Sequence, residues 1–315
     1  MTTFSSAQAA VPAAPAGTGA FRLAVLLVAL TLVLIKMGAM VTSTDSGLAF
    51  YDWPLANGSL WPAQMTTEGY YEHLHRIVGA VVGLVTIALV VVVHRRDPRP
   101  WLRKLVYAVL GLVILQGLLG GATVLARLPA AISATHGTLA QVCLCAMVFV
   151  AFALAPGFAV RCAAPAGQVR TARRLTALAL GMVFAQLVAG AVVRHANLTG
   201  VLWLHVLMSM VVALCILLAA LHAMARFREV PGMATTGRWV LGVLGAQLVL
   251  GFATLAARGA GKGSDSASTE NVGRALILSG HVLFGALTFL LATLLLARVY
   301  RNLVPAPAGG APATR

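Results

Sequence analysis

The chain alternates between long apolar runs and shorter polar connections. Eight runs are roughly 20 residues long, the length that an α-helix needs to cross the hydrocarbon core of a bilayer. They span residues 21–42, 70–94, 104–126, 131–155, 175–194, 201–224, 237–257 and 274–298. Because main-chain polar groups in lipid must pair within the protein, the pattern predicts an all-α integral membrane protein with eight transmembrane helices.

The composition excludes a soluble globular domain. The chain is 60% hydrophobic and 10% charged, with a mean hydropathy of +0.91, whereas a soluble domain carries about 25% charged residues. Residues 1–19 and 303–315 are rich in Ala, Pro, Gly and Thr, so we expect disordered tails there. The run at 21–42 is too long for the apolar core of a cleaved signal peptide.

Basic residues are concentrated in alternate connections. They are Arg95, Arg96, Arg99, Arg103, Lys104, Arg161, Arg170, Arg173, Arg174, Arg226, Arg228, Arg238, Arg298 and Arg301. By the positive-inside rule we expect a multi-pass plasma-membrane protein with cytoplasmic termini and an outer loop at 43–69. The net charge of +15 is scattered over these connections, so it does not indicate a nucleic-acid partner. We expect Lys36, inside the first run, to extend its ammonium group to the outer interface.

Two short internal sequence repeats predict a repeated architecture. The end of the first run, from Gly38 to Gly47, is similar to the end of the fifth, from Gly190 to Gly200. A Gln-x-x-x-Gly pattern recurs as Gln116 with Gly120, Gln186 with Gly190, and Gln247 with Gly251. We therefore expect two pseudo-symmetric four-helix bundles, with an N-terminal half at 20–160 and a C-terminal half at 161–302.

One histidine lies one to two turns inside each even-numbered run. These are His75, His136, His205 and His281, and the predicted topology puts all four at one depth in the outer leaflet. A histidine near a helix end is often only an interfacial residue. Pairs of histidines on facing membrane helices also hold haem iron. Zinc or copper would need further ligands, and the cysteines (Cys143, Cys145, Cys162 and Cys215) form no Cys-x-x-Cys pair.

Ionisable side chains cluster at the start of the second run, between Glu68 and Arg76. Glu72 and His75 are three residues apart and share a helix face, whereas His73 points elsewhere. A carboxylate beside an imidazole at a membrane boundary indicates proton handling or a liganded metal. A structural ion pair between Glu72 and Arg76 is the alternative.

Arg76 and Arg194 lie at the predicted outer interface, where they are possible partners for haem propionates. Simple extension of each side chain to the interface is the alternative. The outer loop at 43–69 is long, and we expect either a lid over a site or a plain interfacial loop.

The motifs together resemble the haem A synthase family of cytochrome oxidase assembly proteins, over about residues 20–300. They are Gly38-Ala-Met-Val-Thr, Asp45-Ser-Gly-Leu, Asp52-Trp-Pro, Glu72-His-Leu-His75-Arg76 and Gly190-Ala-Val-Val-Arg-His195. Many members have a cysteine pair near Asp-Trp-Pro. Residues 49–57 have none here, so the chain resembles a cysteine-free branch.

The resemblance implies that one methyl substituent of haem O is oxidised to a formyl group, giving haem A for cytochrome oxidase. It implies that His75 and His136 serve the substrate haem, that His205 and His281 hold a haem b, and that Glu72 is catalytic. Candidate partners are haem O, an unidentified electron donor, haem O synthase, cytochrome oxidase subunits and membrane lipid.

Two other functions use the same histidines. A non-catalytic di-haem electron-transfer protein would not need Glu72 at a haem edge. A haem carrier with repeat symmetry would need polar residues at mid-depth, of which the sequence has few.

Overall fold

The computed structural model describes residues 18–196, 198–259 and 269–306, and it confirms the eight predicted helices. Each is long and apolar enough to cross a membrane. Their bounds are α1 Thr18–Ser43, α2 Thr67–Arg96, α3 Pro100–Leu125, α4 Ala130–Leu154, α5 Ala166–Ala196, α6 Thr199–Arg226, α7 Met233–Gly259 and α8 Thr269–Asn302. Every helix begins before its predicted apolar run, and α3 and α4 end one residue earlier than predicted. Most of the predicted tails, residues 1–17 and 307–315, lies outside the described residues.

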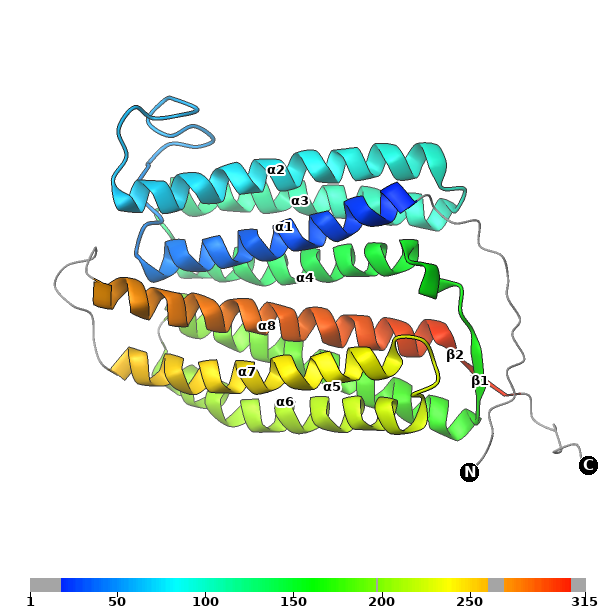
Figure 1. Ribbon diagram of the computed structural model, residues 1–315. Helices are drawn as coiled ribbons and strands as arrows, with labels where there is room; N and C mark the ends of the chain where they lie inside the picture. The colour runs from blue at the N-terminus through cyan, green and yellow to red at the C-terminus, as the bar shows by residue number, and fades with distance from the viewer. Residues whose placement is uncertain (1–17, 197, 260–268, 307–315) are drawn as a thin grey trace, which may run out of the picture.

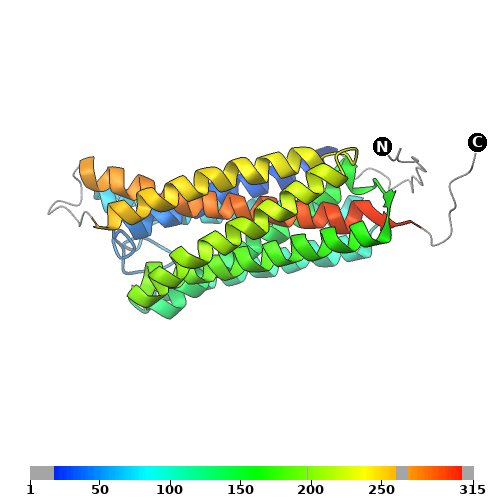
Figure 2. The ribbon, with the colours of Figure 1, turned by 90° about the horizontal axis from the view of Figure 1, so that it is seen from below.

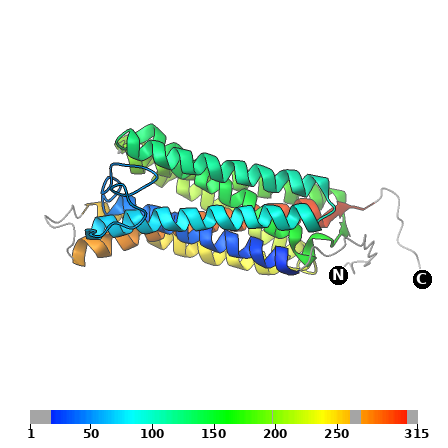
Figure 3. The same cartoon turned by 90° about the horizontal axis from the view of Figure 1, so that it is seen from above.

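The eight helices form one elongated bundle with two groups of four, α1–α4 above α5–α8 in Figure 1. Views from below and from above show all helices lying along one common direction (Figures 2 and 3). In each group every helix packs against the next one in the chain, and the last packs against the first. Each half is therefore a closed ring of four helices, and the order of contacts around the ring is the same in both halves, as the internal sequence repeats predict.

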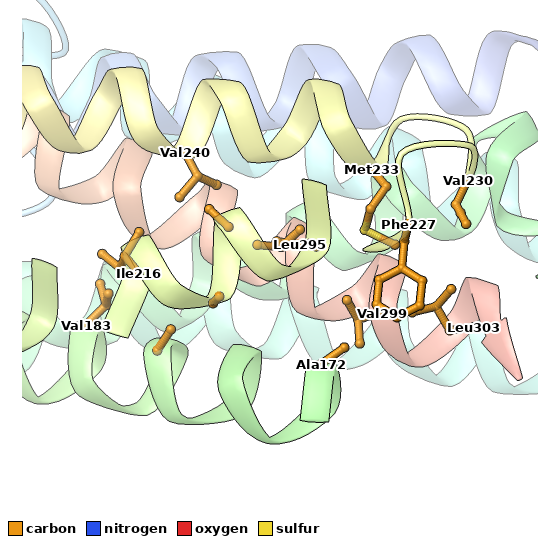
Figure 4. Close-up of a cluster of buried hydrophobic side chains, with 14 of the residues drawn as sticks. Ala172, Val183, Ile216, Phe227, Val230, Met233, Val240, Leu295, Val299 and Leu303 are labelled. Carbon is orange, nitrogen blue, oxygen red and sulfur yellow. The ribbon is translucent and has the colours of Figure 1, made fainter. Parts of the chain in front are cut away.

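Three buried apolar clusters hold the bundle together. One fills the N-terminal half and includes Leu27, Val93 and Met147. A second fills the C-terminal half around Ile216 and Phe227, and Figure 4 shows it between α5, α6, α7 and α8. The third lies between the halves, where residues of α1, α4 and α8 pack together. The two rings thus share a packed seam and form a continuous structure.

A parallel pair of short strands joins the linker between the halves to the end of α8. In β1 (Cys162–Ala164) and β2 (Leu303–Pro305), Cys162 pairs with Leu303 and Ala164 with Pro305. The prediction that the tail begins at residue 303 is therefore wrong for 303–305. These residues are ordered because their main chain pairs with the linker, and Leu303 is fully buried in the C-terminal core. A partner 140 residues away leaves no local signal in the sequence.

The first loop, residues 44–66, covers the end of the bundle opposite to β1 and β2 (Figure 1). It enters α2 through Thr66, whose side chain accepts a hydrogen bond from the Gly69 N–H. This is a normal N-cap, since the side-chain oxygen satisfies a main-chain donor at the helix start.

Lys36 contacts α8. Its ammonium group donates to the Ser279 hydroxyl at 2.6 Å and lies 3.5 Å from the Leu276 carbonyl oxygen, both on α8. Ser279 is buried, and the side chain of Lys36 crosses the seam between the halves to reach it. Lys36 therefore ties α1 to α8.

Candidate functional site

Each of the four predicted histidines packs against a glycine of the preceding helix. A Cβ atom added at the glycine would lie 2.9 Å from Cε1 of the imidazole for Gly38 and His75, and 3.4 Å for Gly120 and His136. The corresponding distances are 3.1 Å for Gly190 and His205, and 3.3 Å for Gly251 and His281. Glycine allows this approach because any side chain would push the ring away. One odd-numbered and one even-numbered helix therefore make a unit that occurs four times.

Contacts across the seam show that the units of both halves lie at one level. Lys36, two residues before Gly38, meets Ser279, which is two residues before His281. Arg194, one turn after Gly190, donates to the Ala39 carbonyl oxygen at 2.6 Å. The prediction that the four histidines share one depth agrees with these cross-links.

In the C-terminal half two of the imidazoles face each other. The ring centres of His205 and His281 are 6.3 Å apart, and the ring planes are inclined at 82°. A metal–imidazole bond is about 2 Å long, so two imidazoles that bind the same metal ion can have their centres roughly 6 Å apart. His205 and His281 are therefore close enough to hold one iron ion together.

The chemistry of the donors also fits a haem. The Nδ1 atoms of all four histidines are buried and have no hydrogen-bond partner among the described residues. A buried, unpaired polar atom costs about 1–3 kcal/mol, so it is retained where something binds there. The described part of the chain has no group of three or more His, Cys, Asp or Glu side chains that could hold a metal ion. Two imidazoles suffice for a haem, whose macrocycle supplies the other ligands.

Glu72 is buried at the end of the N-terminal half where the first loop lies, with 3% of its surface exposed. One carboxylate oxygen accepts a hydrogen bond from the Phe50 N–H at 3.2 Å, and the other pairs with the Arg76 guanidinium at 2.5 Å. The ion pair that the sequence offered as an alternative is therefore present. Its presence does not exclude a second role, because Glu72 also lies one helical turn before His75.

Arg76 fastens the first loop to α2. Besides pairing with Glu72, its guanidinium donates to the main-chain carbonyl oxygens of Asp52 and Leu55. Asp52 in turn accepts from the N–H groups of Asn57 and Gly58 at 2.9 and 2.7 Å. The hydrogen bond from Gly58, with help from Asn57 and the charge of Arg76, lowers the pKa of Asp52. Arg76 thus has three partners within the protein, and its propionate role stays a prediction.

Arg194 crosses from α5 to the end of α1, where it donates to the Ala39 carbonyl and to the Ser43 hydroxyl at 2.8 Å. A cation at a helix C-terminus is favourable, since the last carbonyl groups carry partial negative charge. The structure therefore gives Arg194 a role in joining the halves. Its propionate role also stays a prediction.

The position of Trp53 is not apparent from the sequence. Its ring lies on α3, where a Cβ atom added at Gly121 would be 2.7 Å from the indole. Gly121 follows Gly120, so the indole lies beside the glycine that packs against His136. The Asp-Trp-Pro motif was the only signal for this residue. It reveals the motif but not the helix on which the indole packs.

The described residues define a membrane protein with eight helices that can cross a bilayer. Two imidazoles lie 6.3 Å apart in one half, and a buried carboxylate lies one helical turn before a histidine in the other. Residues 63–202 match the family model described as COX15-CtaA, cytochrome oxidase assembly protein. The matched segment contains Glu72, His75, Arg76, His136 and Arg194. This match and the relatives below confirm the resemblance to the haem A synthase family.

Three relatives are each named heme A synthase. The protein of Symbiobacterium thermophilum is 35% identical over 131 residues, which cover 41% of this chain and 42% of the relative. That of Roseobacter denitrificans is 33% identical over 123 residues, 36% of this chain and 32% of the relative. That of Exiguobacterium sp. AT1b is 34% identical over 134 residues, which cover 40% of this chain and 42% of the relative. The chain thus spans less than half the length of the relatives that it matches.

Proposed function

We propose that this protein is a haem A synthase, an oxidoreductase that converts a methyl group of haem O to a formyl group. The observation that carries the proposal is the repeated histidine–glycine unit, which brings His205 and His281 to 6.3 Å in one half. The similarity to proteins named heme A synthase, over a segment that contains Glu72, His75 and His136, supports the same reaction.

In this proposal His205 and His281 hold a haem b in the C-terminal half. When bound, that group supplies one-electron transfer. The protein contributes the two imidazoles, the apolar shell from α5 to α8, and the exclusion of water from the site. The assignment of haem b rather than another haem rests on the family resemblance.

His75 and His136 bind the substrate haem O in the N-terminal half. Conversion of the methyl group to a formyl group is a four-electron oxidation of the substrate, for which we propose dioxygen as the oxidant. In each of two hydroxylations a hydroxyl replaces one hydrogen, and two electrons from the donor with two protons reduce the second oxygen atom to water. Loss of water from the resulting diol leaves the formyl group. Glu72 is the group that accepts a proton close to the reacting methyl. Its carboxylate is pre-positioned by the Phe50 N–H and by Arg76, and the first loop shields it from water.

The positions of the basic connections support a placement in the plasma membrane with both termini cytoplasmic. The histidine level and the first loop then face the outer side. Electrons come from a donor of unknown identity, and haem O synthase and cytochrome oxidase subunits are the proposed neighbours in supply and delivery.

The experiment that tests this function is expression with a supply of haem O, followed by extraction and chromatography of haem O, its hydroxylated form and haem A. We expect haem A from the unmutated protein. Glu72→Gln should keep both haems but reduce haem A formation by about 10²-fold or more, because the amide cannot accept the proton.

Asp97→Asn is the matched control. Asp97 is also buried, at 2% exposed, and pairs with an arginine, Arg99, at 2.7 Å, but at the opposite end of the bundle. The Asp97→Asn variant should lose an ion pair and still form haem A. Equal losses in both variants would assign Glu72 a structural role only. Haem content without haem A in the unmutated protein would favour an electron-transfer protein or a haem carrier.

A further inference from the structure

A glutamine one helical turn before the glycine fastens three of the four histidine–glycine units. The Gln116 amide donates to the main-chain oxygen of His136 at 3.2 Å, and the Gln186 amide donates to that of His205 at 2.8 Å. The amide nitrogen of Gln247 lies 3.5 Å from the imidazole Nε2 of His281. The Gln-x-x-x-Gly pattern in the sequence is therefore the signature of a repeated contact with a histidine.

The two contacts in a unit lie one turn apart, about 5.4 Å along the odd-numbered helix. The glycine meets the imidazole ring, and the glutamine meets the same histidine at its main chain or its other ring edge. Two points of attachment fix both the height of the histidine-bearing helix and its rotation. A single contact would leave the ring free to turn.

The first unit lacks this amide. Leu34 stands four residues before Gly38, where the other units have glutamine. His75 therefore has no side-chain amide from that position, and only the main chain of Leu34 forms a hydrogen bond with it. Leucine is close to glutamine in size, so the protein itself shows that an apolar side chain can occupy this place.

The C-terminal half also leaves matching donors and acceptors unpaired. The side-chain oxygens of Gln186 and Gln247 are buried without a partner among the described residues, and so is Nδ1 of His205 and of His281. A neutral imidazole has one N–H to donate, and an amide oxygen is a suitable acceptor. Histidines that bind a metal usually donate their other N–H to such a group, which fixes the ring.

We propose that Gln186 and Gln247 are positioning residues for the haem of the C-terminal half. They orient the imidazoles of His205 and His281 and strengthen them as ligands by accepting an N–H. This inference rests on the proposed haem site, and it adds the residues that set the orientation and the reduction potential of that haem.

The test uses the full chain loaded with haem and compares Gln186→Leu and Gln247→Leu with the unmutated protein. Loss of the acceptor makes the imidazole a weaker donor, so the midpoint potential of the haem should rise. The affinity for haem should fall by about tenfold or more. The electron paramagnetic resonance signal of the low-spin iron should also shift, because it reports the orientation of the two rings.

Gln116→Leu is the matched control, since it makes the same change in the same motif of the other half. It should leave the potential and the resonance signal of the C-terminal haem unchanged. Should either leucine variant accumulate poorly, Gln186→Met and Gln247→Met replace it, because methionine fills the space and its thioether is only a weak acceptor.

Potentials, affinities and resonance signals that match those of the unmutated protein in both C-terminal variants would overturn the inference while leaving the haem site intact. An unmutated protein without low-spin haem would overturn the proposed site and the inference with it. Equal shifts in Gln116→Leu and in the C-terminal variants would also overturn the inference, because they would indicate a general loss of packing.

Discussion

At the scale of single residues, the glycines decide where the imidazoles lie. His205 and His281 could be selected from the sequence by their places in alternate apolar runs. In the sequence Gly190 and Gly251 stand out only as members of a short repeat. Spacing along one helix does not reveal which side chain of another helix lies opposite. The contact itself needed the fold.

A methyl group at Gly190 should disturb the C-terminal site. The added carbon would lie 3.1 Å from Cε1 of His205, closer than an ordinary contact, so the ring must move. Overpacking of this kind costs about 1–3 kcal/mol, and we expect Gly190→Ala to lower haem affinity accordingly, measured by titration of the haem-free protein.

Gly181→Ala on the same helix is the control for that prediction. A Cβ atom added there meets no heavy atom within 4 Å, and alanine stabilises a helix relative to glycine by about 0.5–1 kcal/mol. Haem affinity should be unchanged. If Gly190→Ala also binds haem normally, the glycine is not required for the placement of His205.

Lys36 has a partner that its residue type does not reveal. A lysine near a helix end usually extends toward water. Here Ser279 of α8 lies within 2.6 Å of the ammonium group. The position of the ammonium group depends on a hydroxyl 243 positions later in the chain, which the hydropathy pattern does not reveal.

At the scale of elements, the eight helices were predictable because lipid imposes length and composition on each of them. The two short strands were not, since their pairing is non-local. Asn302 completes that pairing. It is 1% exposed, and its amide donates to the carbonyl oxygens of Gly157 at 2.9 Å and Val160 at 2.7 Å in the linker.

We therefore expect Asn302→Ala to destabilise the protein by about 1–3 kcal/mol, because two partly buried carbonyl groups lose their donor. Thermal inactivation in detergent, followed by size-exclusion chromatography, measures the loss. Arg228→Ala is the comparison, since Arg228 forms an exposed pair with Glu229, and such pairs contribute about 0–1 kcal/mol. Equal midpoint temperatures of thermal inactivation for the two variants would show that Asn302 does not hold the linker.

At the scale of the whole molecule, the two rings of helices have the same neighbours, and contacts through Lys36 and Arg194 align their histidine levels. The sequence predicted the two similar halves from its short internal repeats. It could not predict how the rings meet, because the contacts of α1, α4 and α8 at the seam involve apolar residues with no distinctive pattern.

The orientation in the membrane is a prediction for the whole molecule. The basic connections all lie at the end that carries β1 and β2, and the first loop lies at the other end (Figure 1). A periplasm-active reporter fused after residue 60 should therefore be active, whereas one fused after residue 97 should be inactive. The reverse result would put the histidine level on the cytoplasmic side.

Central to the proposed function is that the four histidines His75, His136, His205 and His281 bind haem. The most direct measurement is the reduced-minus-oxidised spectrum of the purified protein, with His205→Ala and His281→Ala beside His222→Ala, which lies near the other end of α6. We predict a low-spin b-type spectrum that is lost in the first two variants and kept in the third. The same low-spin spectrum in both His205→Ala and His281→Ala would contradict the account.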